Sequence, residues 1–478
     1  MKTECTGRKF EFQVLGKRKV ECDFNGGTIT SDAGGLLLRE VEARWGIIRQ
    51  FAQCFKDFRK AEWTEHTVFE LVAQRVYGLA LGYEDLNDHD VLRSDPLMAT
   101  LAGKKDPTGQ DRHQKRDKGK ALAGKSTLNR LELTPEDANE DSRYKKISLD
   151  WDKMNRFLVD VFMQKHPKKC KRIILDLDAT DDPLHGNQEG RFFHGYYKEY
   201  CYLPLYIFCG DDLLCAKLRQ ANGDASEGAL EELKRIIEQI RQKWPKVQIL
   251  IRGDSGFCRE EIMAWCEGNG VDYLFGLAQN SRLLKEMAPE MQEAQALYEQ
   301  SGKAVRVFKD FIYQTLDSWS RARRVVGKAE HLEKGSNPRF VVTSIGPKKM
   351  KAKKLYEKGY CARGEMENRI KEQQLFLFAD RTSTAMMRSN QLRLWFSSVA
   401  YMLMQTFRET ALADTEMQQA QCDTIRLKLL KIGAQIKISV RRIAVQLASG
   451  CPYQEIFACA YDNLQRLTPL RCYIGAHK

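Results

Sequence analysis

The sequence predicts an α/β protein with a mixed-sheet core, a β-rich insertion in that core and a mainly helical N-terminal region. From residue 171 to 280 the pattern alternates between buried-strand and helix character, which is typical of a sheet covered by helices. Strand character returns between 303 and 345, and long amphipathic patterns precede the core and follow the insertion. The chain has 478 residues, which is enough for several domains.

Residues 1–150 are predicted to form the helical N-terminal region. Alternating residues at 9–24 indicate short strands that end at a Gly-Gly pair. Amphipathic patterns then predict long helices over 31–55 and 66–86. The segment 103–125, which precedes a further short helix, is basic, polar and poor in apolar residues.

The core is predicted to occupy residues 151–302 and, after an insertion at 303–350, to resume over 351–478. Its first strand, KRIILDLD at 171–178, is an aliphatic run bounded by charge. Two strands rich in aromatic and apolar residues, a Ser-capped helix, a strand that ends in Gly-Asp, a helix and a last strand follow it. The second part of the core is predicted to contain long helices, a strand and a final helix.

Four carboxylates stand within seven positions at the end of the first core strand: Asp176, Asp178, Asp181 and Asp182. So dense a negative charge is costly to bury unless it binds something positive. Active-site groups of α/β sheets gather at the carboxyl ends of strands, and Asp254 follows another such end. Mg²⁺ prefers oxygen ligands such as carboxylates, and a pair of these ions can clamp the attacking and leaving oxygens of a phosphoryl displacement.

A third acid is predicted on a helix that follows the insertion. Tyr360, Arg363, Glu367, Lys371 and Gln374 follow one another at steps of 3, 4, 4 and 3 residues, so they share one helix face. On that face we expect Tyr360 to stack or form a hydrogen bond, Arg363 to bind a phosphate and Glu367 to bind metal. The carboxylate of this helix would complete the site begun by the two strand-end aspartates.

The ordered set of these motifs resembles the DDE transposases of bacterial insertion sequences, and among them the insertion-sequence family numbered thirteen-eighty. The matching segments are, in order, GYEDLNDHDVLRSDP, LDATDDPLHGNQEGRFFHGYYKEYCYLPLYIF, RGDSGF and YCARGEMENRIKE. The match extends over nearly the whole chain, from about residue 28 to 460. The resemblance implies an RNase H-like catalytic core of the Tyr-x2-Arg-x3-Glu group, interrupted by the β-rich insertion.

The same resemblance implies a catalytic and metal-binding trio of Asp178, Asp254 and Glu367, with two Mg²⁺ ions that Mn²⁺ can replace. It implies cut-and-paste transposition, in which phosphodiester hydrolysis at the ends of the element is followed by strand transfer. The DNA partners would be the terminal inverted repeats and the target duplex, held by a homodimer. The group often has a lysine seven residues after the glutamate, where this chain has Gln374, whereas Lys371 lies one turn earlier.

The net charge of +13 favours a polyanionic partner, and basic residues are concentrated in segments 103–125, 321–328 and 348–354. A solvated loop is the alternative for each segment. We expect the N-terminal region to bind DNA and Trp319 to stack on a displaced base, and a buried position in a sheet is the alternative for Trp319. The predicted DNA-contacting residues are Tyr360, Arg363, Lys371, Trp319, Arg321, Arg323, Arg324, Lys348, Lys349 and Lys351.

Two other functions fit part of the sequence. The Asp-x-Asp-x-Thr motif that begins at Asp176 also matches haloacid-dehalogenase-type phosphatases, in which Asp176 attacks phosphorus and Asp178 acts as acid and base. A catalytically inactive, DNA-binding relic of a transposase is a further alternative. As a transposase, the chain would instead pair Asp176 with a basic side chain. The structural alternatives are a turn or cap for Asp178 and Asp254 and a solvated helix face for Glu367.

No stretch approaches the ~20 uncharged apolar residues of a membrane-spanning helix, and the N-terminus lacks the apolar run of a signal peptide. We therefore expect a cytoplasmic protein, and the resemblance implies a bacterial one that associates with the nucleoid through DNA. The 14 cysteines are scattered without Cys-x2-Cys spacing, which favours reduced thiols over disulfides or a zinc site.

Overall fold

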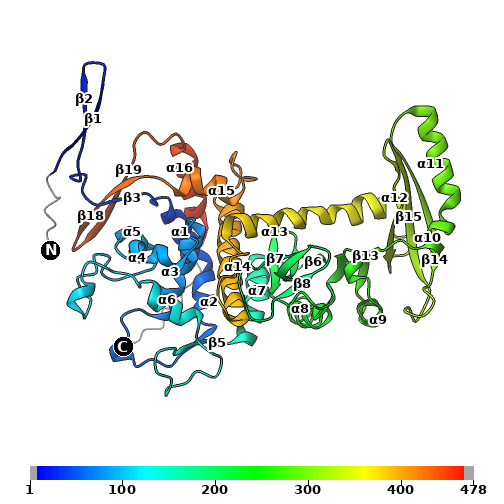
Figure 1. Ribbon diagram of the computed structural model, residues 1–478, viewed down its shortest axis with the longest axis horizontal. Coiled ribbons are helices and arrows are strands. Elements are labelled where there is room, and N and C mark those ends of the chain that lie inside the picture. Colours follow the sequence, from blue (N-terminus) through cyan, green and yellow to red (C-terminus); the bar gives the residue numbers. More distant parts are fainter. Residues whose placement is uncertain (1–7, 169, 468–478) are drawn as a thin grey trace. The chain divides into compact units, whose positions relative to one another are not determined.

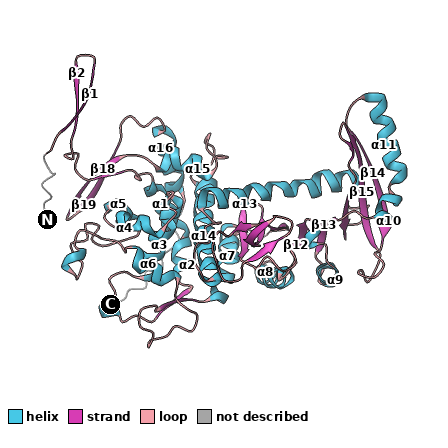
Figure 2. Cartoon of the chain, in the orientation of Figure 1, coloured by secondary structure: helices cyan, strands magenta, loops and turns pink. Residues whose placement is uncertain are grey.

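The computed structural model describes residues 8–168 and 170–467, and Figures 1 and 2 trace its helices and strands along the chain. The chain forms two compact units, Met1–Leu149 with Val399–Lys478 and Asp150–Ser398. Helix α14 (Met387–Thr410) runs across the boundary between them. The segment 351–478, predicted as one part of the core, is therefore divided between the two units at Val399. Its C-terminal part belongs to the first unit because one of its strands pairs with a strand of the N-terminal residues.

The first unit joins the N-terminal residues to the C-terminal ones through a small sheet. Strand β3 (Ile29–Thr30) pairs antiparallel with β18 (Ala434–Ser439), which pairs in turn with β19 (Arg442–Leu447). The predicted helix over 31–55 is interrupted at Gly46, whose φ of 61° is a left-handed conformation that glycine adopts at little cost. The helices of this unit are α1 (Gly35–Trp45), α2 (Ile47–Ala52), α3 (Val68–Ala80), α4 (His89–Leu92), α5 (Pro96–Leu101), α6 (Lys125–Glu132), α15 (Cys422–Ile425) and α16 (Gln454–Arg466), and its other strands are β1 (Phe10–Leu15), β2 (Arg18–Cys22), β4 (Phe55–Asp57) and β5 (Ile147–Leu149).

The second unit is built on a mixed sheet with the strand order β11-β10-β6-β12-β13-β17-β15-β14. The central strands β6, β12 and β13 run parallel, while β10 and β11 on one side and β17, β15 and β14 on the other are antiparallel to their neighbours. The strands of this sheet are β6 (Arg172–Ala179), β10 (Leu205–Cys209), β11 (Asp212–Lys217), β12 (Gln248–Gly253), β13 (Asp272–Leu277), β14 (Val305–Tyr313), β15 (Arg323–Leu332), β16 (Gly335–Ser336), which pairs with β15, and β17 (Arg339–Thr343). The α/β class and the mixed sheet predicted from the sequence are confirmed.

Alternating side chains of the central strands pack against different helical segments. Ile249 and Ile251 on β12 belong to one apolar cluster with α8 (Ala229–Lys243), whereas Leu250 between them packs with residues that include Leu355. Side chains of neighbouring strand positions point to opposite faces, so the parallel strands are apolar on both faces. The other helices of the unit are α7 (Trp151–Lys165), α9 (Glu260–Gly268), α10 (Ser281–Glu286), α11 (Ala288–Ser301), α12 (Ala352–Lys354) and α13 (Gly364–Leu377).

The β-rich insertion continues the core sheet, because β17 pairs antiparallel with β13. Strands β14 and β15 then form a long antiparallel ribbon, against which α11 packs. Helices α10 and α11 were not predicted from the sequence. Within the described residues, no helix combines the length and the apolar character that crossing a bilayer requires.

Candidate active site

Asp178 and Asp254 lie at the same edge of the sheet, on neighbouring parallel strands. In the register of β6 and β12, Asp176 is opposite Arg252, and each of the two acids stands two residues further along its strand. The carboxyl ends of parallel strands meet at one edge of a sheet. The structure therefore brings the two predicted strand-end acids together.

Asp176 makes a buried bidentate ion pair with Arg252. Nε and Nη2 of Arg252 donate to the two carboxylate oxygens at 2.6 and 2.7 Å, and both side chains are 8% exposed. The remaining Nη1 donates to the carbonyl oxygen of Gly359 at 2.7 Å. Such a fork-to-fork pair compensates both charges, so Asp176 is held by a basic partner as expected of a transposase.

Asp254 caps the turn that follows its strand. Its carboxylate accepts a hydrogen bond of 2.8 Å from the backbone N–H of Gly256. On the neighbouring strand, a Cβ at Gly276 would lie 2.6 Å from the hydroxyl of Tyr360 and 2.9 Å from the backbone nitrogen of Ser255. The missing side chain at Gly276 therefore lets Tyr360 approach the Asp254 turn.

Glu367 reaches the site from helix α13, which continues a nearly unbroken helical segment that starts at Ala352 (Figure 1). Leu355–Tyr360 is a π-helix and Cys361–Arg363 is a 3₁₀ turn, and such departures from α-helix are frequent at functional sites. Arg363 lies between two of the acids: its Nη1 is 3.4 Å from Oδ2 of Asp178, and its Nη2 is 3.7 Å from Oε1 of Glu367. The sheet edge and the helix thus meet at one guanidinium group.

The three acids share one electrostatic environment. Burial raises the pKa of Asp178 to about 6; the Arg363 charge opposes this shift, and the charges of Asp254 and Glu367 add to it. A carboxyl group is affected in this way only by charges that lie near it. The register of β6 and β12 and the two ion pairs of Arg363 place the three predicted acids in one region of the second unit.

The donor set of this site fits a divalent cation. Carboxylates from two strand ends and a helix supply the hard oxygen ligands that Mg²⁺ prefers. Among the described residues, no group of three or more His, Cys, Asp or Glu side chains already has the spacing to hold a metal ion. The counter-charge comes from Arg363, whose buried Nη1 lies within ion-pair distance of Asp178 but makes no hydrogen bond to the part of the chain that the structure describes. The guanidinium group therefore compensates the acids only loosely.

The remaining residues of the predicted helix face differ in their surroundings. The ring of Tyr360 packs 5.8 Å from the ring of Tyr356, and burial raises the pKa of its hydroxyl. Lys371 is exposed one turn beyond Glu367. Gln374 donates a hydrogen bond of 3.0 Å to the carbonyl oxygen of Asp181 and so ties α13 to the loop after β6.

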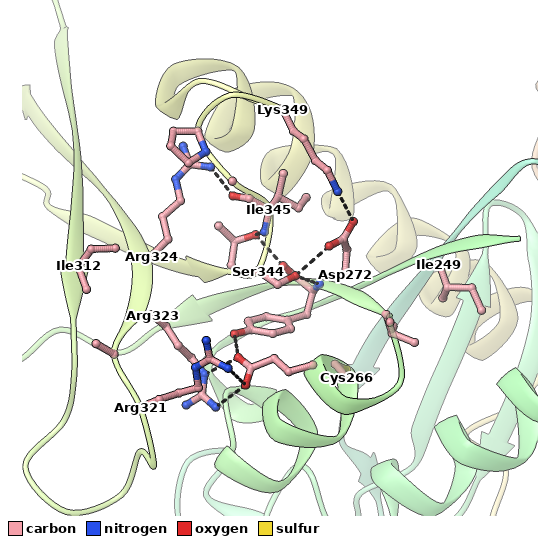
Figure 3. Close-up of a pocket in the computed structure, with 18 of the residues that line it drawn as sticks. Ile249, Cys266, Asp272, Ile312, Arg321, Arg323, Arg324, Ser344, Ile345 and Lys349 are labelled. Carbon is pink, nitrogen blue, oxygen red and sulfur yellow. Dashed lines mark hydrogen bonds and ion pairs between the residues drawn. The ribbon is translucent and has the colours of Figure 1, made fainter. Parts of the chain in front are cut away.

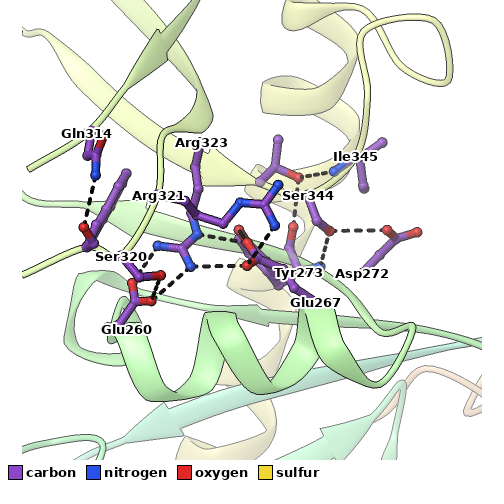
Figure 4. A network of polar contacts seen from close by, with 12 residues as sticks. Glu260, Glu267, Asp272, Tyr273, Gln314, Ser320, Arg321, Arg323, Ser344 and Ile345 are labelled. Atoms are coloured by element: carbon purple, nitrogen blue, oxygen red, sulfur yellow. Dashed lines mark hydrogen bonds and ion pairs between the residues drawn. The ribbon is translucent and has the colours of Figure 1, made fainter.

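Two basic residues and the tryptophan predicted to contact DNA in the insertion are buried, and this corrects the prediction for them. Trp319 is 6% exposed and packs edge to face on Tyr313, which is the sheet-core position that the sequence left open. The Arg323 side chain is 2% exposed and binds Glu260 at 2.5 Å and Glu267 at 2.8 Å (Figure 4). These side chains hold the insertion to helix α9 and are not available to DNA.

The charge and the hydrogen-bond donors of Arg324 also have partners within the chain. Its Nε is 2.6 Å from Asp310, and its two terminal nitrogens donate to the carbonyl oxygens of Ile345 and Met350. These bonds order the turn at 345–350. The predicted DNA contacts that stay exposed on or near this turn, and on the insertion, are Lys348, Lys349, Lys351 and Arg321.

A pocket of about 830 Å³ lies between β13 and the insertion strands (Figure 3). Its lining includes Arg321, Lys349 and Asp272, together with residues at the amino ends of β12 and β13. None of the three acids of the predicted trio lines it. The pocket is therefore distinct from the acidic edge, which lies at the opposite ends of these strands.

Sequence reasoning missed Arg252, Gly276 and the aromatic loop after β6. Arg252 stands two residues before Asp254, as Asp176 does before Asp178, and this equal spacing on parallel strands is a signal that could have paired them. Gly276 carries no recognisable signal, because its role depends on a side chain more than 80 residues away.

Comparison with known proteins identifies the family of the chain. No curated protein sequence matches the chain. Among solved structures, the chain is similar to the piggyBac transposase in a cryo-EM structure of its synaptic complex with hairpin DNA, with a TM-score of 0.40 and 10% identity over 92% of this chain and 86% of that one. A family model described as transposase DDE domain group 1 matches residues 12–469. The chain belongs to this family of DDE transposases, enzymes that cut and join DNA strands.

Proposed function

We propose that this transposase excises an insertion sequence at its terminal inverted repeats and inserts it into target DNA, with Asp178, Asp254 and Glu367 as its catalytic acids. The observation that carries the proposal is the convergence of three acids: Asp178 on β6 and Glu367 on α13 lie beside the guanidinium group of Arg363, and Asp254 follows the neighbouring parallel strand β12. Members of the family use divalent metal ions. We propose Mg²⁺ as the ion, two per site, with Mn²⁺ as a substitute.

Asp178, Asp254 and Glu367 would together hold the ions. Bound at this edge, the ions would supply Lewis-acid stabilisation of the attacking and leaving oxygens of the phosphodiester. They would also take over from Arg363 as counter-charge for the carboxylates. Arg363, freed from Asp178 and Glu367, is then positioned to bind a phosphate with its planar fork of donors.

The exposed lysines would hold the DNA without reading its sequence. Lys348, Lys349 and Lys351 are exposed on and beside the turn that Arg324 orders, and contacts to phosphates supply most of the sequence-independent affinity of DNA-binding proteins. We propose a homodimer on paired element ends. Sedimentation of the protein with and without end DNA tests this assembly.

The phosphatase alternative conflicts with the surroundings of Asp176. Its nucleophile would be a carboxylate that is 8% exposed and has both oxygens bound by Arg252. A nucleophile needs a free oxygen directed at the substrate. The inactive-relic alternative predicts DNA binding without cleavage, so the same cleavage assay tests it.

The metal requirement is the experiment for this proposal. Single-turnover cleavage of labelled element-end DNA should occur with Mg²⁺ or Mn²⁺ and fail with Ca²⁺, which prefers longer bonds and a looser geometry. A catalytically inactive relic would bind the same DNA and cleave it with none of these ions. Undiminished cleavage in excess chelator would contradict the proposed chemistry.

A further inference from the structure

A hairpin with exposed aromatic side chains follows the catalytic strand β6. It consists of β8 (Phe192–His194), a turn, and β9 (Glu199–Tyr202), and we call residues 191–202 the aromatic hairpin. Phe193 is 56% exposed, Tyr196 at the turn 83% and Tyr200 46%. Large aromatic side chains gathered on one exposed element usually mark a binding surface.

The two faces of the aromatic hairpin differ. On the outer face Phe193 and Tyr200 are a cross-strand pair with ring centroids 5.6 Å apart, and the Arg191 guanidinium lies 4.6 Å from the Tyr200 ring. On the inner face Cys201 is fully buried, and Tyr197 packs against its apolar cluster. One face is therefore used by the fold, while the other presents rings and a cation to solvent.

The inner face connects the hairpin to the catalytic site. Strand β9 pairs with β7 (Asp182–Pro183), which begins four residues after Asp178, and the charges of Asp181 and Asp178 add to the effect of burial in raising the pKa of the Tyr197 hydroxyl. The ring of Tyr196 packs edge to face on that of Tyr197, with centroids 5.0 Å apart. The exposed Tyr196 ring thus stands beside a residue that neighbours the site of cleavage.

The base of the hairpin is fixed to the segment that leads into α14. Gln188 donates to the carbonyl of Thr382 at 3.1 Å, and the backbone N–H of Glu189 donates to Ala385 at 2.8 Å. Strand β7 (Asp182–Pro183) pairs with β9 on its other side. These bonds fix the backbone at the base of the hairpin before any ligand binds, which lowers the entropy cost of binding.

We propose that the aromatic hairpin binds unpaired bases of the DNA strand at the cleavage site, with Tyr196, Phe193 and Tyr200 as stacking surfaces and Arg191 and Lys198 near the phosphates. Aromatic rings flanked by cations are the usual platform for single-stranded nucleic acid, because every base has a face on which to stack. The chain's net charge of +13 suits a polyanionic strand rather than a basic protein partner. This proposal rests on the proposed active site, whose acids define where the strand is cut.

Because Trp319 is buried, we assign the stacking on an unpaired base to the aromatic hairpin instead. Trp319 was the residue expected to stack on a displaced base, and its ring is in the core of the insertion. The Tyr196 ring is exposed, as a base-stacking side chain requires, and it packs on Tyr197 in the hairpin that follows β6.

The test compares two DNA probes by fluorescence anisotropy, using protein with Glu367→Gln so that no cleavage occurs. One probe is a blunt duplex, and the other is the same duplex with a short oligothymidine overhang. Tyr196→Ala should weaken binding of the overhang probe by roughly 5- to 100-fold and leave the blunt probe unchanged, whereas Tyr196→Phe should bind both normally. Tyr461→Ala, which removes an exposed tyrosine ring (47%) from α16, is the matched control.

Three results would overturn the proposal: equal binding of the two probes by the parent protein, no loss of overhang binding in Tyr196→Ala, or equal losses on both probes. A change of sedimentation in Tyr196→Ala without a change in DNA binding would assign the hairpin to a protein interface and overturn it too. Failure of the proposed active site would give a different result from failure of the hairpin proposal. In that case the protein with Glu367 intact would not cleave element ends with Mg²⁺.

Discussion

Two clusters of charged residues in the second unit differ in how their charges are compensated. In the insertion, Arg323 is almost fully buried and bound by two glutamates at 2.5 and 2.8 Å. At the proposed catalytic edge, Arg363 stands 3.4 Å from Asp178 and 3.7 Å from Glu367, and the glutamate side chain is 52% exposed. Both clusters were predicted to be functional from the sequence, but only the second keeps charge that is not fully compensated.

This difference teaches how a structural charge can be told from a functional one. Asp176 and Asp178 show the same difference within a single strand. Arg252 binds Asp176 bidentately, whereas Asp178 has a pKa raised to about 6. A fully paired buried charge holds elements together, and removing its partner leaves an uncompensated charge. A loosely paired group of acids is free to bind a cation.

The largest effect on stability should follow the loss of Arg323. Arg323→Met leaves Glu260 and Glu267 without their buried partner and should lower the free energy of unfolding by about 3 kcal/mol. Arg321→Met, at a side chain that is 66% exposed, should change it by less than about 0.5 kcal/mol. Urea denaturation of the two variants measures the difference. If Arg323→Met kept its stability but bound DNA more weakly, Arg323 would be a DNA-contacting residue, as predicted from the sequence, and this account of it would be wrong.

Arg363→Ala should reduce cleavage by about 10²-fold and change the affinity for end DNA much less, because its fork of donors would act on the scissile phosphate. Arg363→Lys keeps the charge without the fork and should recover little of the lost rate. Single-turnover cleavage beside an equilibrium binding titration separates the two effects. An equal fall in both quantities would make Arg363 an ordinary DNA-binding residue.

The raised pKa of Asp178 predicts a dependence of stability on pH in protein free of metal. Its pKa rises from 3.8 to about 6 on folding, so the folded state holds this proton more tightly. Stability should therefore fall by about 2 kcal/mol as the pH rises from about 4 to about 6, and stay level above that window. Asp178→Asn should remove this fall. Stability curves of the two proteins that run parallel would contradict the shift.

The smallest effect should come from the exposed lysines. Replacing Lys348, Lys349, Lys351, Lys353 and Lys354 together by Gln should weaken binding to element ends and random DNA alike. The slope of log affinity against log salt should flatten by up to roughly 0.9 for each phosphate that the variant no longer neutralises. Binding titrations at several salt concentrations measure it. An unchanged slope would assign these lysines to a solvated loop.

Local patterns were sufficient to predict most of the core. The aliphatic run before Asp178, the Gly-Asp end of β12 and the spacing from Tyr360 to Glu367 each depend on neighbours in the sequence, so the sequence reveals them. Because the carboxyl ends of parallel strands share an edge, the meeting of the two aspartates could also be predicted.

What the sequence did not reveal depends on distant partners. Nothing near Arg323 or Arg324 in the sequence shows that their charges are taken by α9 and by β14 with the 345–350 turn. The sequence also did not reveal that Trp319 is buried rather than exposed for stacking on a base. Helices α10 and α11 lie in a segment with no strong apolar periodicity, and α11 buries little besides Ala294.

Single-turnover cleavage of element-end DNA with Mg²⁺ by Asp178→Asn, Asp254→Asn and Glu367→Gln tests the central claim, that these three acids form one metal-dependent site. Each variant should lose cleavage by roughly 10³-fold or more and still bind the DNA, because an amide keeps the shape of the side chain but not the charge that holds a dication. Asp176→Asn should lose stability through its orphaned Arg252 rather than chemistry. Near wild-type cleavage by any one of the three variants would contradict the claim.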